Sequence, residues 1–282
     1  MGFFGSSRGA AEREVPKAPV LTSPSGRGWD LNSTPPRTSR SAVRSSTGKM
    51  RARDSRPRGL PGDRKVAVLG GSFDPITDGH LKCACEIVHA RAADEVWIVP
   101  CGARPDKPSL RTPYMHRLIM CHLAVDTSFG SHFPIRVCDI EMGEPQALST
   151  YMLLQRLNAD HPGTKFMFVL GADLLESIKT WGAPGVENAG EKLYRESNFL
   201  LLARPGYDIP LDLPANFKLL TPQAGTRIVT EDVSSSEIRK RIAANFGETE
   251  RAEMQQGNFA MVDGLLAPAV LAHIIRYDIY GL

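Results

Sequence analysis

Two polar side chains, Thr77 and His80, stand three residues apart beside a glycine pair, and their spacing suits the binding of a phosphate group. The stretch reads Gly70-Gly71-Ser72-Phe73-Asp74-Pro75-Ile76-Thr77-Asp78-Gly79-His80. It follows an apolar run over 65–69 that predicts a buried strand, and it precedes a helical pattern. Glycines let backbone N–H groups approach an anion, and a helix N-terminus attracts negative charge. We therefore expect Thr77 and His80 to face one anion, such as a nucleotide triphosphate.

Apolar runs and helical patterns alternate along the rest of the chain. Strands are predicted over 65–69, 95–99, 135–138, 165–170, 198–203, 217–220 and 227–230, and helices over 79–91, 114–125, 150–157, 234–245 and 268–277. This alternation is typical of an α/β fold with a doubly wound parallel sheet, which binds ligands beyond the carboxyl ends of its strands. We expect one Rossmann-like domain over 64–282, with a helical closure at its C-terminal end.

A second candidate phosphate site is the run Ser234-Ser235-Ser236-Glu237-Ile238-Arg239, at the start of a predicted helix. Ser234 and Glu237 have the spacing of a capping box, which needs no ligand. The functional interpretation is compatible with this one, because a capped helix still offers free N–H groups. Ser235 and Arg239 share one helix face and could hold phosphate oxygens.

Together the two runs resemble the paired signatures of the nicotinamide or nicotinate mononucleotide adenylyltransferases, a branch of the nucleotidylyltransferase superfamily. Segments 100–108, 170–175 with Trp181, and 203–207 resemble the same family, so the resemblance covers about residues 65–282. It implies a fold of the nucleotidylyltransferase type. It also implies transfer of the adenylyl group of ATP to nicotinamide mononucleotide or nicotinic acid mononucleotide. The products would be NAD or deamido-NAD and pyrophosphate, and Mg²⁺ would accompany the ATP.

The resemblance also implies roles for individual residues. The implied catalytic residues are His80 and Thr77 at the α-phosphate and Arg239 at the leaving pyrophosphate. Further ATP contacts are implied for Gly71, Ser72, Phe73, Ser234, Ser235 and Ser236. Mononucleotide contacts are implied for Ser72, Phe73, Lys107, Gly171, Asp173 and Trp181. No protein ligand to a metal is implied, and catalysis would depend on positioning and charge stabilisation.

Several alternatives stay open. Trp181 could stack on the pyridine ring or be a half-buried core aromatic, and Arg117 is interpreted as a helix salt-bridge partner, with a phosphate contact as the alternative. Residues 144–147 do not match the family closely, so no base contacts are assigned there. The alternative functions are a sister nucleotidylyltransferase with another phosphate acceptor and a nucleotide-binding chaperone-like protein. The sequence does not decide between the acid and amide forms of the pyridine.

Charge divides the chain into two parts. Residues 1–64 carry a net charge of +8 and residues 65–282 a net charge of −5, which together make the total of +3. Because the predicted domain is mildly acidic, the basic balance does not indicate a nucleic-acid partner. Residues 1–63 are rich in Ser, Arg, Pro and Gly and have little apolar periodicity, so they predict a disordered basic N-terminal extension.

Composition also bears on location. The chain has no apolar run that could span a membrane, and its N-terminus lacks the apolar segment of a secretory signal. The five cysteines have no paired spacing, which is typical of reduced thiols. We expect an intracellular protein, cytoplasmic or nuclear, with no membrane span. The resemblance adds that it could be a homo-oligomer.

Overall fold

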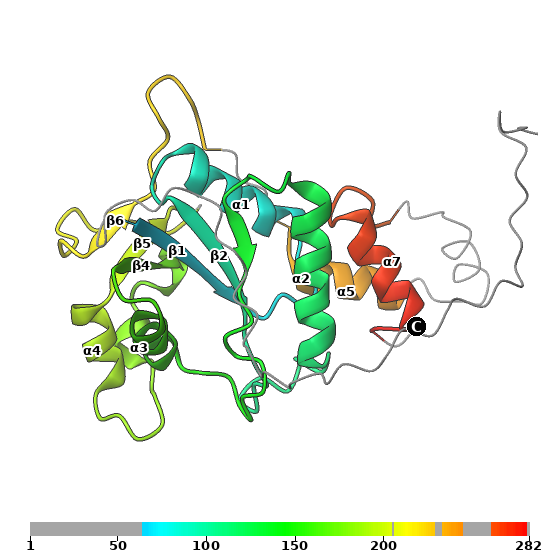
Figure 1. Ribbon diagram of the computed structural model, residues 1–282, viewed down its shortest axis with the longest axis horizontal. Coiled ribbons are helices and arrows are strands. Elements are labelled where there is room, and N and C mark those ends of the chain that lie inside the picture. Colours follow the sequence, from blue (N-terminus) through cyan, green and yellow to red (C-terminus); the bar gives the residue numbers. More distant parts are fainter. Residues whose placement is uncertain (1–63, 205, 229–232, 245–260, 281–282) are drawn as a thin grey trace, which may run out of the picture. The chain divides into compact units, whose positions relative to one another are not determined.

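The computed structural model describes residues 64–204, 206–228, 233–244 and 261–280 (Figure 1). The extension predicted to be disordered, residues 1–63, lies outside the described residues. None of the helices in the described ranges combines the length and the apolar character that a membrane span requires.

Within the described residues, six parallel strands form the centre of the fold. They are β1 (Arg64–Gly71), β2 (Glu95–Pro100), β3 (Ile135–Val137), β4 (Thr164–Gly171), β5 (Asn198–Leu202) and β6 (Phe217–Leu219). Their order across the sheet is β3-β2-β1-β4-β5-β6, and all neighbours are parallel. The chain reverses its direction of winding between β1 and β4, which is where doubly wound folds bind ligands. The predicted Rossmann-like fold is confirmed.

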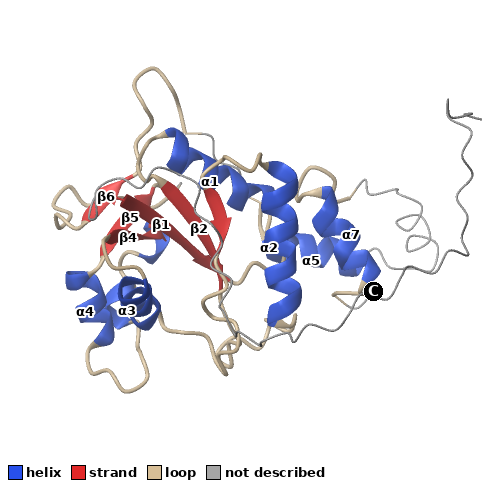
Figure 2. Cartoon of the chain, viewed as in Figure 1, coloured by secondary structure: helices blue, strands red, loops and turns tan. Residues whose placement is uncertain are grey.

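Helices cover both faces of this sheet (Figure 2). They are α1 (Asp78–His89), α2 (Tyr114–Ser128), α3 (Thr150–Asp160), α4 (Ala189–Glu196), α5 (Ser235–Ala244) and α7 (Pro268–Arg276). Buried side chains of α1, α2, α5 and α7 form one core cluster with the sheet, and those of α3 and α4 form a second cluster. The helices nearest the C-terminus therefore pack on the same side as α1 and α2.

Strand β1 shows why these sequences read as continuous apolar runs. Ala67 and Leu69 belong to the cluster with α1, whereas Val66 and Val68 belong to the cluster with α3. Successive side chains of a strand point to opposite faces, and here both faces are covered by helices. The central strand is thus apolar and buried throughout 66–69, and the polar turn begins only after the strand has ended.

Two segments differ from the prediction. Helix α4 was not predicted, because it is short and polar and buries little besides Ala189, Gly190 and Leu193. A strand was predicted over 227–230; residues 227 and 228 lie in no strand, and residues 229 and 230 are outside the described residues. The other predicted elements match, with ends that differ by a few residues.

Gly190 explains how α4 is held, and it provides a test of the fold. A Cβ at this position would lie 2.2 Å from the carbonyl oxygen of Lys179, beside the short helix η2 (Ile178–Thr180). We predict that Gly190→Ala lowers the free energy of unfolding by about 2 kcal/mol, although alanine is the better helix former. Urea denaturation measures this change.

The matched control is Gly130→Ala. Among the described residues, no heavy atom lies within 4 Å of a Cβ built at Gly130. This variant should change the free energy of unfolding by less than about 0.5 kcal/mol. Equal unfolding free energies for the two variants would contradict the close packing of α4 on η2.

Candidate active site

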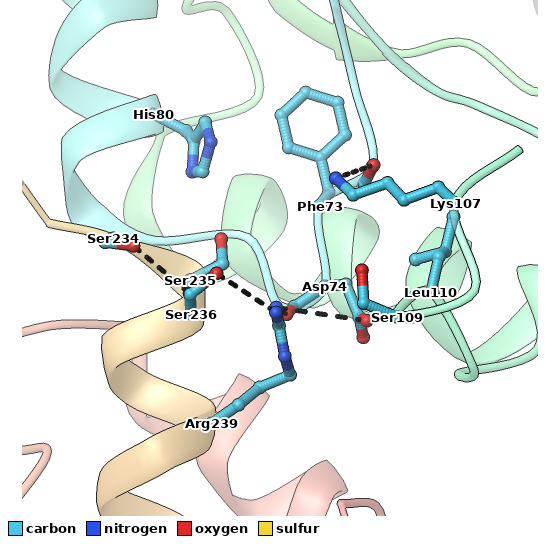
Figure 3. A pocket seen from close by; sticks show the side chains of 11 residues that line it. Phe73, Asp74, His80, Lys107, Ser109, Leu110, Ser234, Ser235, Ser236 and Arg239 are labelled. Carbon is cyan, nitrogen blue, oxygen red and sulfur yellow. Dashed lines mark hydrogen bonds and ion pairs between the residues drawn. The ribbon is translucent and has the colours of Figure 1, made fainter. Parts of the chain in front are cut away.

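A pocket of about 260 Å³ lies where the turn after β1, the loop after β2 and the first turns of α5 meet (Figure 3). Its lining consists of Ser72, Phe73, Asp74, His80, Lys107, Ser109, Leu110, Ser234, Ser235, Ser236 and Arg239. Both candidate phosphate motifs of the sequence therefore line the same pocket. The lining combines hydroxyl groups with one imidazole, one ammonium and one guanidinium group, and these groups can bind phosphates.

The first turn of α1 holds the His80 ring. Its Nδ1 accepts the backbone N–H of Thr77 at 3.0 Å and lies 2.7 Å from the Thr77 hydroxyl oxygen. The Thr77 hydroxyl in turn accepts the backbone N–H of His80, which completes a capping box with imidazole in place of the usual Glu or Gln. Because a backbone N–H can only donate, Nδ1 is the acceptor, and the neutral ring carries its proton on Nε2.

The charge state of His80 follows from its surroundings. Burial lowers its pKa to about 4, and the positive charge of Arg204 contributes to the same effect. The ring is therefore neutral at pH 7. It offers Nε2–H as a hydrogen-bond donor in the pocket that His80 lines.

Thr77 has a different position from the one predicted. It is 1% exposed, it is not among the lining residues, and its hydroxyl contacts His80. In this structure Thr77 orients the histidine and does not face the pocket itself. A contact from Thr77 to a phosphate stays a prediction.

Helix α5 is attached to the turn after β1 by its polar side chains. Ser235 Oγ donates to the carbonyl oxygen of Pro75 at 2.8 Å, and Arg239 Nη1 donates to that of Asp74 at 2.6 Å. Arg239 Nη2 donates to Ser236 Oγ at 3.1 Å. As predicted, Ser235 and Arg239 lie on one helix face. That face contacts the first motif directly and brings the two motifs together.

At the start of α5 a simple serine cap is present in place of the predicted capping box. Ser234 Oγ accepts the backbone N–H of Ser236 at 3.2 Å. The carboxylate of Glu237 pairs with Arg241 at 3.0 Å, one turn further along the helix. Ser234 therefore caps the start of α5, whereas Glu237 forms an ion pair on the exposed side of the helix.

Asp74 is a pocket residue that sequence reasoning did not single out. It is 3% exposed, and its Oδ1 accepts the hydroxyl of Tyr280 at 2.8 Å, while Oδ2 lies 4.0 Å from Arg239 Nη1. Burial and the nearby Asp74 carboxylate raise the pKa of Tyr280. The partner Tyr280 follows α7, far from Asp74 in the sequence, so no local pattern could have indicated this contact. Ser109 and Leu110 also line the pocket without a sequence signal.

Ser72, Phe73 and Lys107 lie together at the opposite wall. Lys107 Nζ donates to Ser72 Oγ at 3.2 Å. Phe73 has a φ of 45°, a left-handed conformation that is uncommon for a bulky residue and indicates a constrained turn. A Cβ at Gly71 would lie 3.0 Å from the Phe73 ring, which explains the absence of a side chain there.

The remaining predicted residues lie outside this pocket, at the end of β4. Gly171 ends that strand, and the Asp173 carboxylate lies 3.1 Å from Arg204 Nε. Trp181 is half-buried, with its ring edge-on to Phe168 at a centroid distance of 6.4 Å. Since β4 neighbours β1, these residues lie along the same carboxyl edge of the sheet. Their contacts with a mononucleotide stay predictions.

The depressed pKa of His80 predicts a pH dependence of stability. Between the ordinary histidine pKa of about 6.5 and the folded value of about 4, the unfolded chain binds a proton that the folded chain does not. Stability should therefore fall as the pH falls through this window. We predict that the free energy of unfolding decreases less between pH 7 and pH 4 in His80→Gln, which retains a capping side chain, than in wild type, by on the order of 2 kcal/mol. Chemical denaturation at pH 7 and pH 4 measures this decrease for both proteins.

His273 provides the control for that experiment. Its pKa is also lowered, first by burial and then by the neighbouring His116, and it lies outside the pocket. His273 contributes equally to the pH dependence of the unfolding free energy in wild type and in His80→Gln. The difference between the two proteins in this pH dependence therefore measures the contribution of His80. Identical pH dependence in both would show that His80 is not a neutral, desolvated imidazole.

The chain is similar to known proteins over most of this domain. The family model for cytidylyltransferase-like proteins matches residues 68–241. A protein of Oceanobacillus iheyensis, named "Probable nicotinate-nucleotide adenylyltransferase", is 28% identical over 77% of this chain and 97% of its own length. A protein of the same name from Bacillus cytotoxicus is 34% identical over 63% of this chain and 85% of its own length.

Solved structures agree with these relatives. One is described as "Plasmodium falciparum nicotinic acid mononucleotide adenylyltransferase complexed with NaAD". It has 27% sequence identity and a TM-score of 0.58, and the match covers 77% of this chain and 97% of that chain. The family match includes His80 and Arg239, so it spans both motifs that line the pocket. The chain belongs to the nicotinate-nucleotide adenylyltransferase family of cytidylyltransferase-like proteins.

Proposed function

We propose that this adenylyltransferase joins ATP to nicotinic acid mononucleotide. The mononucleotide 5′-phosphate attacks the α-phosphorus of ATP, its P–O bond to the pyrophosphate group breaks, and deamido-NAD and pyrophosphate leave. The observation that carries the proposal is the meeting of His80 with the serines and Arg239 of α5 in one pocket. The names of the relatives, together with a similar solved structure in complex with NaAD, favour the acid form of the acceptor.

His80 has the geometry of a donor to the α-phosphate. Its Nδ1 is occupied by Thr77, so Nε2–H can stabilise the negative charge that develops on a non-bridging oxygen. Because the ring is neutral before ATP binds, binding requires no proton loss from His80. The reaction needs little covalent chemistry from the protein, so such positioning accounts for the expected rate gain.

The other lining groups are assigned either to the β- and γ-phosphates of ATP or to the phosphate of the mononucleotide. Ser235, Ser236 and Arg239 lie at the start of α5, where the helix dipole and free N–H groups suit the β- and γ-phosphates of ATP. Lys107 reaches the pocket from the loop after β2, on the side opposite Ser234 in Figure 3. We assign Lys107 to the incoming phosphate of the mononucleotide, because it is then opposite the leaving group, as in-line attack requires.

Mg²⁺ is proposed to enter with the triphosphate, where it would neutralise part of the phosphate charge. The lining fits a cation carried by phosphates. Among the lining residues the one carboxylate, Asp74, accepts a hydrogen bond from Tyr280 and faces Arg239. The other side-chain oxygens of the lining are serine hydroxyls, which can complete a shell made mainly of phosphate oxygens and water.

The acceptor is tested by a coupled assay of dinucleotide formation from ATP and Mg²⁺. Nicotinic acid mononucleotide, nicotinamide mononucleotide and pantetheine phosphate are compared as acceptors. We expect kcat/KM to be at least about tenfold higher with the acid than with the amide, since polar recognition discriminates strongly. No product with either pyridine mononucleotide, from protein with a cooperative thermal transition, would contradict the proposed function. Product with pantetheine phosphate alone would support the sister-enzyme alternative.

The role of His80 is tested by His80→Gln. Glutamine at the third helical position can retain the cap on α1, but its amide does not reproduce the position of Nε2–H. We expect kcat to fall by about 10²-fold or more while the thermal midpoint at pH 7 stays near that of wild type. Steady-state kinetics and calorimetry on the same preparations measure both quantities. A variant with wild-type kcat would exclude His80 from the transition state.

A further inference from the structure

Arg117 of α2 is a buried cation that lies behind the pocket. It is 1% exposed, and a buried guanidinium is costly unless its hydrogen-bond donors are satisfied. Within the described residues it has no carboxylate at ion-pair distance. Burial raises the pKa of the Glu141 carboxyl, and the positive charge of Arg117 acts in the opposite direction. The prediction of a helix salt bridge was therefore wrong, and Arg117 is not among the residues that line the pocket.

The guanidinium group donates to three backbone carbonyl groups instead. Its Nη1 donates to the oxygen of Ser72 at 2.7 Å, Nη2 to that of Gly102 at 3.1 Å, and Nε to that of Thr112 at 3.1 Å. These acceptors belong to the turn after β1, the loop after β2 and the segment before α2. One planar side chain thus holds together three segments at the carboxyl edge of the sheet.

The bond to Ser72 fixes the next backbone N–H in the pocket wall. The peptide unit that joins Ser72 to Phe73 is planar and trans, so its C=O and N–H groups point in opposite directions. Since the carbonyl oxygen points to Arg117 on α2, the N–H of Phe73 points away from α2. Both Ser72 and Phe73 line the pocket, whereas no residue of α2 does. The hydrogen bond from Arg117 therefore orients the N–H of Phe73 toward the pocket.

The bond to Gly102 constrains the wall that carries Lys107. The N–H of Gly102 donates to Glu141 Oε2 at 2.7 Å, and its carbonyl accepts from Arg117. A Cβ at Gly102 would lie 3.1 Å from the backbone nitrogen of Ala147, so the backbone is tightly enclosed there. Gly102 is held on both sides by buried charged groups, and the loop that follows it brings Lys107 to Ser72.

We propose that Arg117 is a positioning residue for adenylyl transfer. It sets the orientation of the Phe73 N–H and the path of the Lys107 loop without contacting either substrate. This inference rests on the proposed function, because it assigns the pocket wall to nucleotide phosphates. Misplacement of a phosphate by about 1 Å commonly costs on the order of 10²-fold in rate.

Two variants and one control test the proposal. Arg117→Lys keeps the positive charge but cannot reach three carbonyl groups with one ammonium, and Arg117→Ala leaves space for free guanidinium. The control is Arg136→Lys, which changes an arginine of β3 that pairs with Glu95 at 3.4 Å and does not line the pocket. For each protein, kcat per folded enzyme, KM for both nucleotides, the thermal midpoint and the Kd for ATP are measured.

We expect Arg117→Lys to lower kcat/KM by about 10²-fold, with a reduced kcat per folded enzyme. Millimolar guanidinium should restore part of the activity of Arg117→Ala, and potassium chloride at the same concentration should not. Arg136→Lys should lose thermal stability only. Wild-type kcat and KM in folded Arg117→Lys would overturn the proposal, whether or not Arg117→Ala folds.

The proposal and the function on which it rests can fail separately. Wild-type protein that forms no dinucleotide would contradict the function. The Kd for ATP would then still report on Arg117: weaker binding by Arg117→Lys than by Arg136→Lys supports positioning, and equal binding overturns it.

Discussion

The pocket depends on two hydrogen bonds from α5 to the turn after β1. Ser235 donates to the carbonyl oxygen of Pro75 and Arg239 to that of Asp74. The acceptors are backbone groups, so these bonds form only when the turn has its observed conformation. That conformation is supported in turn by Arg117 on the carbonyl of Ser72. Fold and pocket are therefore coupled, because each bond that shapes the turn also sets the distance between the two phosphate motifs.

The same interactions that stabilise α1 prepare His80 for its proposed role. The capping box with Thr77 satisfies free N–H groups at the helix start, and it also fixes the imidazole tautomer. Burial keeps the ring neutral, so the donor is present before a triphosphate arrives. A histidine at the third helical position thus performs the structural task of a Glu or Gln without bringing a negative charge near phosphates.

Much of the fold could be predicted from the sequence because the sheet is covered on both faces. Fully apolar runs such as that of β1 are strong signals, and alternating helices imply parallel pairing. Helix α4 could not be predicted in this way, because contact between Gly190 and η2 holds it, and it is short and has few apolar residues. The lining of one pocket by both phosphate motifs was implied by the family resemblance, which assigned both motifs to the phosphates of one ATP molecule.

Details of the site depended on contacts between distant segments. The sequence pattern indicated that Thr77 and His80 share a helix face, but not that Thr77 turns its hydroxyl to His80 and is buried. Arg117 lies on an amphipathic helix, where an arginine usually pairs with a carboxylate, and only the folded chain brings three carbonyl groups to it. Likewise, Asp74 accepts a hydrogen bond from Tyr280, which follows α7 and lies near Asp74 only in the folded chain.

A crystal structure with a non-hydrolysable ATP analogue and Mg²⁺ would test the shared phosphate site most directly. We predict that Nε2 of His80 lies within hydrogen-bond distance of an α-phosphate oxygen, while Ser235, Ser236 and Arg239 contact the β- and γ-phosphates of the same molecule. The hydrogen bonds of α5 to Asp74 and Pro75 should be retained. A triphosphate bound by only one motif, or bound outside this pocket, would contradict the conclusion that the two motifs form one site.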